Sequence, residues 1–141
     1  MEHEQLGPRS SAMGELLRRK LRERLAGYEM VKEVVGRGLL NGIQFQAPSQ
    51  LKLRLPFEAF HHIHPGMFGQ IVVMRLFRDK NVLAQICGNN FLMLKAAPPL
   101  LITQAQVDEF VDAMAHVVDW MHHSTSFCTG ALGLARRSVN I

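Results

Sequence analysis

FLMLKAAPPLLITQAQVDEFVDAMAHVVDWM, residues 91–121, carries the strongest structural signal in the chain. Its apolar start, residues 91–96, predicts a short strand that ends before Pro98-Pro99, because proline cannot continue a strand ladder. Thr103 followed three residues later by Gln106 is the pattern of a capping box, which predicts a helix N-terminus. Apolar residues then recur at helical spacing on one face, namely Val107, Phe110, Val111, Met114, Val117, Val118 and Met121. The stretch therefore predicts a strand followed by a long amphipathic helix.

Periodicity in the residues before this stretch predicts two more helices and three more strands. Residues 9–26 form a helical pattern of apolar residues four apart, with Pro8 at the first helical position and Gly27 as the stop. Residues 67–79 form a second helical pattern. Residues 47–66 contain three prolines and a histidine cluster, and they predict a long irregular connection. The remaining strands are predicted at residues 30–35, 39–46 and 82–87, with turns at 36–38 and 88–90.

This order of elements predicts an α+β fold, a two-layer sandwich in which helices cover one face of a small, mainly antiparallel sheet. The domain is expected to span residues 9–123, preceded by a polar segment at 1–8. A tail at 124–141 follows, with a possible short helix at 131–137. A chain of 141 residues is long enough to bury one core.

Composition excludes several classes of protein. Hydrophobic residues make up 48% of the chain, which is incompatible with general disorder, and no apolar run is long enough for a membrane span. No secretory signal is visible, so we expect a cytoplasmic protein. The net charge of +4 comes largely from the predicted helix at 9–26, where cations alternate with Glu15 and Glu23. That pattern is typical of a solvated helix face, and we expect no nucleic-acid partner.

The histidines and cysteines do not predict a metal site or a nucleophile. His61, His62 and His64 lie close together, but no further ligand pattern completes a zinc site, so we expect an exposed or interface loop. The pair His122-His123 suits a helix C-terminus. Cys87, in an apolar strand, is expected to be a buried and inert thiol, and Cys128 a partly exposed one.

Lys95 is the candidate functional residue, because it stands near the end of the apolar strand 91–96. A lysine there can present its ammonium to an anion in a cleft. The alternative is a charge on an edge strand that faces solvent and prevents aggregation.

Two segments resemble class III pyridoxal-phosphate (PLP) aminotransferases. YEMVKEVVGRGLLNGIQF, residues 28–45, is similar to the family's RGxGLxxGIEF segment, and FLMLKAAPPLLITQAQV, residues 91–107, is similar to its RxxPPLxIT signature. The resemblance extends over about residues 9–121. It implies part of an enzyme that transfers an amino group from an amine or amino acid to a 2-oxo acid. The family usually has arginine at the position of Lys95, where it binds the substrate carboxylate, and lysine cannot form that planar two-point contact.

The resemblance also implies what this chain lacks. It covers only the C-terminal third or so of such an enzyme, and none of the five lysines stands in the family's Schiff-base setting. We therefore expect a fragment or excised small domain without catalytic residues, inactive alone and binding no PLP by itself, although the complete enzyme uses PLP. The implied partners are a large PLP-binding domain and a second copy in a homodimer. The alternatives are a stand-alone binding or assembly module and, less in keeping with the charge pattern, a nucleic-acid binder through residues 18–24.

Overall fold

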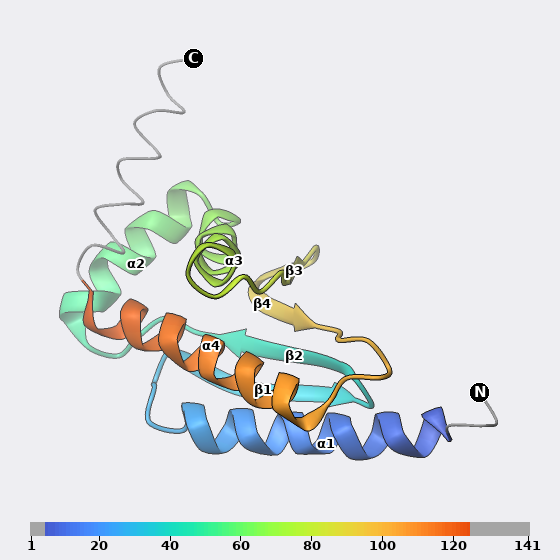
Figure 1. Cartoon of the computed structure of the whole chain (residues 1–141). Helices are drawn as coiled ribbons and strands as arrows, with labels where there is room; N and C mark the ends of the chain where they lie inside the picture. The colour runs from blue at the N-terminus through green and yellow to red at the C-terminus, as the bar shows by residue number, and fades with distance from the viewer. Residues whose placement is uncertain (1–4, 125–141) are drawn as a thin grey trace.

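The computed structural model describes residues 5–124, apart from the side chains of Pro56, Phe60 and Ile63. This part of the chain contains four helices and four strands, arranged as two strand pairs with helices before, between and after them (Figure 1). The predicted α+β class is confirmed. The elements are α1 (Leu6–Leu25), β1 (Val31–Arg37), β2 (Leu40–Phe45), α2 (Leu51–Ile63), α3 (Met67–Lys80), β3 (Gln85–Cys87), β4 (Asn90–Ala96) and α4 (Gln104–His123).

The strands form one antiparallel sheet in the order β1-β2-β4-β3. The register places Val34 beside Ile43, Ile43 beside Leu94, and Leu94 beside Ile86. Ile43 and Leu94 are completely buried, and Val34 is 5% exposed. Because side chains alternate between the two faces of a strand, this row identifies the core-facing side of the sheet.

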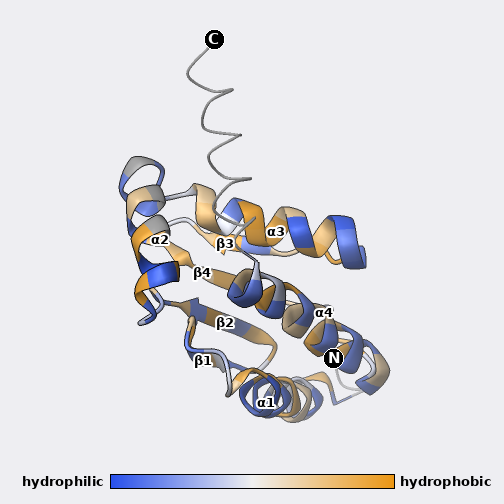
Figure 2. Ribbon diagram, turned by 90° about the vertical axis from the view of Figure 1, so that its left-hand side faces the viewer, coloured by the Kyte–Doolittle hydropathy of each residue, from blue (hydrophilic) through white to orange (hydrophobic). Residues whose placement is uncertain are grey.

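Helices α1, α3 and α4 cover that core-facing side. In Figure 2 the strands lie to the left of α4, with α1 below it and α3 above it. The apolar face predicted for the last helix is the one that packs inward, since Val107, Met114 and Val117 are fully buried. The core therefore lies between the sheet and these three helices, as expected of a two-layer fold.

The helix ends follow the predicted signals, with one shift. Thr103 accepts a hydrogen bond from the Gln106 backbone N–H, and the Gln106 side chain accepts one from the Thr103 N–H at 3.0 Å, so the capping box is confirmed. Helix α1 begins at Leu6 rather than Arg9, and Pro8 is its third residue instead of its first. Proline is tolerated there because the first-turn N–H groups have no partner within the helix.

The irregular connection predicted for residues 47–66 is wrong, because residues 51–63 form α2. Pro48 and Pro65 flank this helix, and Pro56 falls within its range. Phe57 packs this helix against α3. The Phe57 side chain is 3% exposed, and its ring lies edge-on to the Phe68 ring, with 5.2 Å between the ring centres. This tertiary contact outweighs the local breaking signal of the prolines. The strand predicted at 82–87 is also shorter, and it begins at Gln85.

The basic face of α1 is less solvated than predicted. Arg18 is only 7% exposed and donates hydrogen bonds to the Gly38 carbonyl (2.9 Å) and to Asn41 Oδ1 (2.8 Å) in the β1–β2 hairpin. It also pairs with Glu15, and this hydrogen bond lowers the pKa of the Glu15 carboxyl. Lys20 and Arg24 pair with Asp108 and Asp112 of α4. Much of the positive charge thus holds α1 against its neighbours.

Candidate functional site

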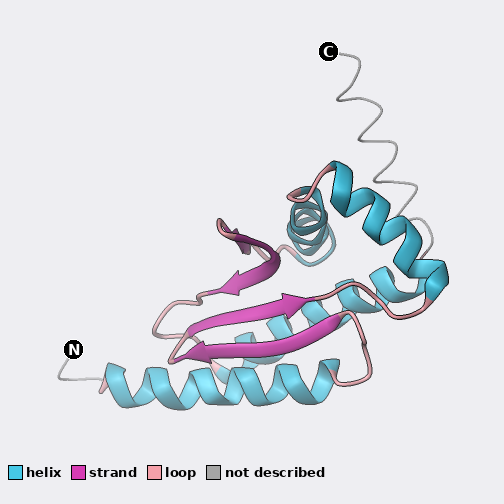
Figure 3. Ribbon diagram, turned by 180° about the vertical axis from the view of Figure 1, so that it is seen from behind, coloured by secondary structure: helices cyan, strands magenta, loops and turns pink. Residues whose placement is uncertain are grey.

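Within residues 5–124, no helix packs on the face of the sheet opposite the core. Figure 3 views the molecule from behind, with strands β1 and β2 in front of α4. The register places Val35, Gly42, Lys95 and Gln85 side by side across the four strands of this open face. They alternate with the buried row that contains Ile43 and Leu94, so they belong to the opposite side. Lys95 thus lies within this face and between two neighbouring strands.

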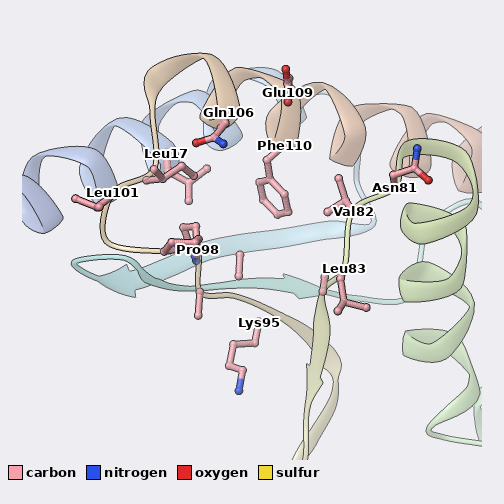
Figure 4. A pocket seen from close by; sticks show the side chains of 15 residues that line it. Leu17, Asn81, Val82, Leu83, Lys95, Pro98, Leu101, Gln106, Glu109 and Phe110 are labelled. Atoms are coloured by element: carbon pink, nitrogen blue, oxygen red, sulfur yellow. The ribbon is translucent and has the colours of Figure 1, made fainter.

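Lys95 is not on an edge strand, because β4 lies between β2 and β3. The edge-strand alternative is therefore wrong. Figure 4 shows the Lys95 side chain extending away from Phe110 and α4. The residue is half-buried, and its side chain has no hydrogen bond or ion pair with any residue in the described part of the chain.

The side chains near Lys95 on the open face are uncharged. Gly42 has no side chain, and Met93 and Val35 fill the space beside it, since a Cβ built there would lie 3.0 Å from the Met93 sulfur. Gln85 is the neighbour on the other strand. Val35 is 37% exposed and Phe91 is 45% exposed. Apolar side chains beneath a packed layer would be less exposed than this. The open face combines Lys95 with apolar side chains and, two residues to either side of Val35 on β1, with the charged side chains of Glu33 and Arg37.

A cavity of about 610 Å³ lies between the first turns of α4, the middle of α1 at Leu17, and the segments that precede β3 and follow β4. Its lining is mainly apolar and includes Leu17, Val82, Leu101 and Phe110. Lys95 contributes to its wall, but its ammonium points away from Phe110 across the sheet. The cavity therefore does not use the charge of Lys95.

The other charged clusters connect helices rather than form a site. Asp79 of α3 pairs with Arg75 at 2.6 Å and with His116 of α4 at 3.1 Å. Burial acts to raise the pKa of Asp79, but the His116 hydrogen bond and the Arg75 charge together lower it below its ordinary value. The Arg75 guanidinium also lies 4.3 Å from the centre of the Trp120 ring. This cluster joins α3 to α4.

Tyr28 is involved in a similar contact between the chain after α1 and the end of α4. Its hydroxyl donates a hydrogen bond to Asp119 at 2.9 Å. Burial, together with this carboxylate, raises the pKa of the Tyr28 hydroxyl. The contact is remote from Lys95 along the sheet, and it is structural.

The histidines of α2 and α4 lie on other elements than Lys95, whereas Cys87 is in β3, the strand that pairs with β4. His61 and His62 are in α2 rather than in the predicted loop, and the His61 ring stacks on Phe57. His122 and His123 end α4, as predicted. Cys87 is a free thiol that is partly exposed rather than buried. Residues 5–124 contain no group of three or more potential ligands that could hold a metal ion, and Cys128 and the helix expected at 131–137 lie outside this range.

No helix among the described residues is both long and apolar enough to cross a membrane.

Comparison with known proteins relates this fold to transaminases. Residues 1–118 match the model of the family described as aminotransferase class III. Aminotransferase PigE of a Serratia species is 28% identical across 76% of this chain and 16% of its own length. The diaminobutyrate–2-oxoglutarate aminotransferase of Rhizobium meliloti is also 28% identical, across 82% of this chain and 23% of its own.

Solved structures agree with the family match. A transaminase from a study of ancestral reconstruction has a TM-score of 0.66 and 32% identity, over 85% of this chain and 24% of its own. A Bacillus anthracis aminotransferase has a TM-score of 0.65 and 23% identity, and the match covers 84% of this chain and 25% of the aminotransferase chain. The chain thus spans roughly a sixth to a quarter of the proteins that it matches. It belongs to the class III aminotransferase family.

Proposed function

We propose that this chain is the C-terminal small-domain portion of a PLP-dependent class III aminotransferase. The complete enzyme would transfer an amino group from an amine or amino acid to a 2-oxo acid. The observation that carries the proposal is an open sheet face with an unpaired lysine, in a chain that matches about a quarter of solved aminotransferases. We further propose that the complete enzyme is a homodimer, as the family resemblance implies, and that it is cytoplasmic.

The described residues do not fit PLP. The family implies a Schiff-base lysine, a carboxylate for the ring nitrogen and a cradle for the phosphate. Lys20 is paired with Asp108, while Lys32, Lys52 and Lys80 are exposed on the surface. Lys95 has no carboxylate beside it, and the large cavity is mainly apolar with its only lysine directed away. We therefore assign PLP to a large domain, and we expect this chain to be inactive alone.

The role left to this chain is to bind and orient substrate. The open face would pack toward the large domain and form one wall of the active site, which excludes water and fixes the substrate position. Lys95 would hold an anionic group of the substrate. A lysine ammonium acts there as a point charge, whereas the arginine usual in the family makes two parallel hydrogen bonds. Looser orientation of the bound group is the expected consequence.

A domain graft tests this proposal. Residues 6–123 replace the matched segment of the reconstructed ancestral transaminase, and the expected result is a folded, PLP-loaded enzyme that turns over. Lys95→Met in the graft should raise KM for acidic substrates more than it lowers kcat, while Lys32→Met, on the exposed surface, should change neither. A graft that folds and binds PLP without any turnover would contradict the assignment. So would equal kinetics for the Lys95 variant and its parent.

The open face also favours a second candidate, a stand-alone binding or assembly module. Exposed Val35, Leu40 and Phe91 on an uncovered sheet are suited to a protein partner. Size-exclusion chromatography with light scattering separates the two candidates. A self-associating chain whose assembly is lost on Phe91→Ser would support the module, and a dye-negative monomer would eliminate it.

A further inference from the structure

The cavity of about 610 Å³ is bounded by apolar side chains from separate segments of the fold. Leu17 of α1, Phe110 of α4 and Val82, before β3, all line it, and Figure 4 shows the Phe110 ring directed from α4 toward the sheet. Leu83 and Leu101 also line it, but they are 83% and 56% exposed. The apolar surface thus continues from the cavity to the outside of the molecule, which is typical of a surface that another protein segment covers.

The charges of the lining residues do not point into the cavity. Figure 4 shows the Lys95 ammonium directed away from Phe110, and Glu109 on the opposite side of α4. The polar residues Asn81 and Gln106 are exposed to solvent. Small-molecule sites usually combine apolar walls with a few converging polar groups that orient the ligand. This lining therefore matches apolar side chains of a protein better than a polar metabolite.

The start of α1 lies at the edge of the same cavity. Arg9 Nη2 donates hydrogen bonds to the carbonyls of Ile102 at 3.1 Å and Leu101 at 3.4 Å, and both of these residues line the cavity. Figure 1 shows the start of α1 at the same end of the molecule as the segment between β4 and α4. In the function proposed above, the large domain precedes α1 in the chain. That domain would therefore be connected to this one beside the cavity.

We infer that the cavity receives apolar side chains of the large domain, in addition to the contact proposed at the open face. The inference rests on the proposed function, because it names a second surface through which this domain binds the rest of the enzyme. The cavity wall that follows β4 is already restrained, since the Ile102 N–H donates to the Pro99 carbonyl at 3.0 Å and Pro98-Pro99 limits the backbone. This wall begins directly after Lys95, so packing on it would fix the end of β4.

Thiol labelling measures whether the large domain covers Leu83. Leu83→Cys is made in a Cys87→Ser and Cys128→Ser background, both in the 141-residue chain and in the domain graft described above. Maleimide labelling is then followed peptide by peptide by mass spectrometry. The new thiol should react rapidly in the isolated chain, because Leu83 is 83% exposed there. In the graft it should react at least about tenfold more slowly, since labelling would require the domains to separate locally.

Further variants connect the protection to the cavity. Leu55→Cys is the matched control on α2, where Leu55 is 60% exposed, and it should react equally fast in both proteins. Leu101→Cys tests the opposite wall and provides a second variant if the first does not fold. If the graft does not fold, the isolated chain is mixed with the separately expressed large domain of the reconstructed transaminase, which should protect position 83 in the same way.

The outcomes separate this inference from the proposed function. Fast labelling at position 83 in a graft that turns over would overturn the inference and leave the proposed function intact. Slow labelling at position 83 in the isolated chain would also overturn it, with light scattering showing whether a second copy is the occupant. Equal protection at positions 83 and 55 would overturn the assignment to this cavity. Protection at position 83 alone, in a graft without turnover, would support the contact and count against the proposed function.

Discussion

Replacing Gly14 by alanine tests the close contact between α1 and the β1–β2 turn. A Cβ built on Gly14 would lie 1.7 Å from the Gly38 carbonyl oxygen and 2.3 Å from its carbon. Both are backbone atoms, so no side-chain rotation relieves the overlap. Reaching an ordinary separation of about 3.4 Å requires the helix and the turn to move apart by roughly 1.7 Å.

The cost follows from what that displacement disrupts. Leu17 and Leu21, on the next turns of α1, are 1% and 0% exposed, so moving the helix loosens the core at a cost of about 1–3 kcal/mol. The hydrogen bond from Arg18 to the Gly38 carbonyl also opens, which costs about 1.5–3 kcal/mol for a charged donor. The higher helix propensity of alanine offsets about 1 kcal/mol of this cost. The expected net loss in the free energy of unfolding is about 1.5–5 kcal/mol.

Urea denaturation followed by circular dichroism measures this loss. The control is Gly7→Ala in the same helix, where no atom lies within 4 Å of the added methyl group, so the stability should change by no more than about 1 kcal/mol in either direction. Unfolding of the Gly14 variant within about 0.5 kcal/mol of the parent would refute the reasoning. It would mean that α1 shifts on the sheet without cost.

Three further predictions concern the helices. Thr103→Ala should lower the free energy of unfolding by about 1 kcal/mol through loss of the N-cap of α4, and Thr103→Ser should restore most of it in the same urea assay. Because His116 and Arg75 lower the pKa of Asp79 in the fold, this carboxylate contributes stability above its ordinary pKa of 3.8, and the contribution is lost as the pH falls below that value through the folded pKa. Asp79→Asn should therefore flatten the stability profile below about pH 4, and an unchanged acid slope would argue against the pairing. Phe57→Ala should detach α2, with a loss of about 3 kcal/mol and faster amide exchange across 51–63 than across α4; uniform exchange would indicate that α2 is not a separate unit.

Elements with strong periodicity could be predicted from the sequence, whereas α2 could not. The apolar stripe from Val107 to Met121 and the capping residues Thr103 and Gln106 are local signals, so α4 was predicted almost to the residue. Helix α2 depends on the contact of Phe57 with Phe68, which comes from a different helix. Local signals in residues 47–66 are dominated by prolines, and no pattern within that window reports a tertiary contact.

Arg18 was misjudged for a related reason. Five cations in residues 18–24 predict a solvated face, but Arg18 is three residues before Leu21 and seven before Leu25, which places it on the buried side of α1. This spacing is a signal that could have identified it. Its partners, the Gly38 carbonyl and Asn41, are in a hairpin whose approach depends on the absence of a side chain at Gly14. That approach follows from tertiary packing and is not visible in the helix pattern.

Lys95 could be selected from the sequence, but its surroundings could not. Its position at the end of an apolar strand left both an edge location and a cleft location open, with the edge location favoured, and strand order rules out the edge because β4 is internal. A half-buried ammonium without a counter-ion contributes less to stability than an apolar side chain at the same position would. Residues that violate local stability rules in this way are expected where function requires them. The unpaired charge is therefore a stronger indication of a binding site than the identity of the residue alone.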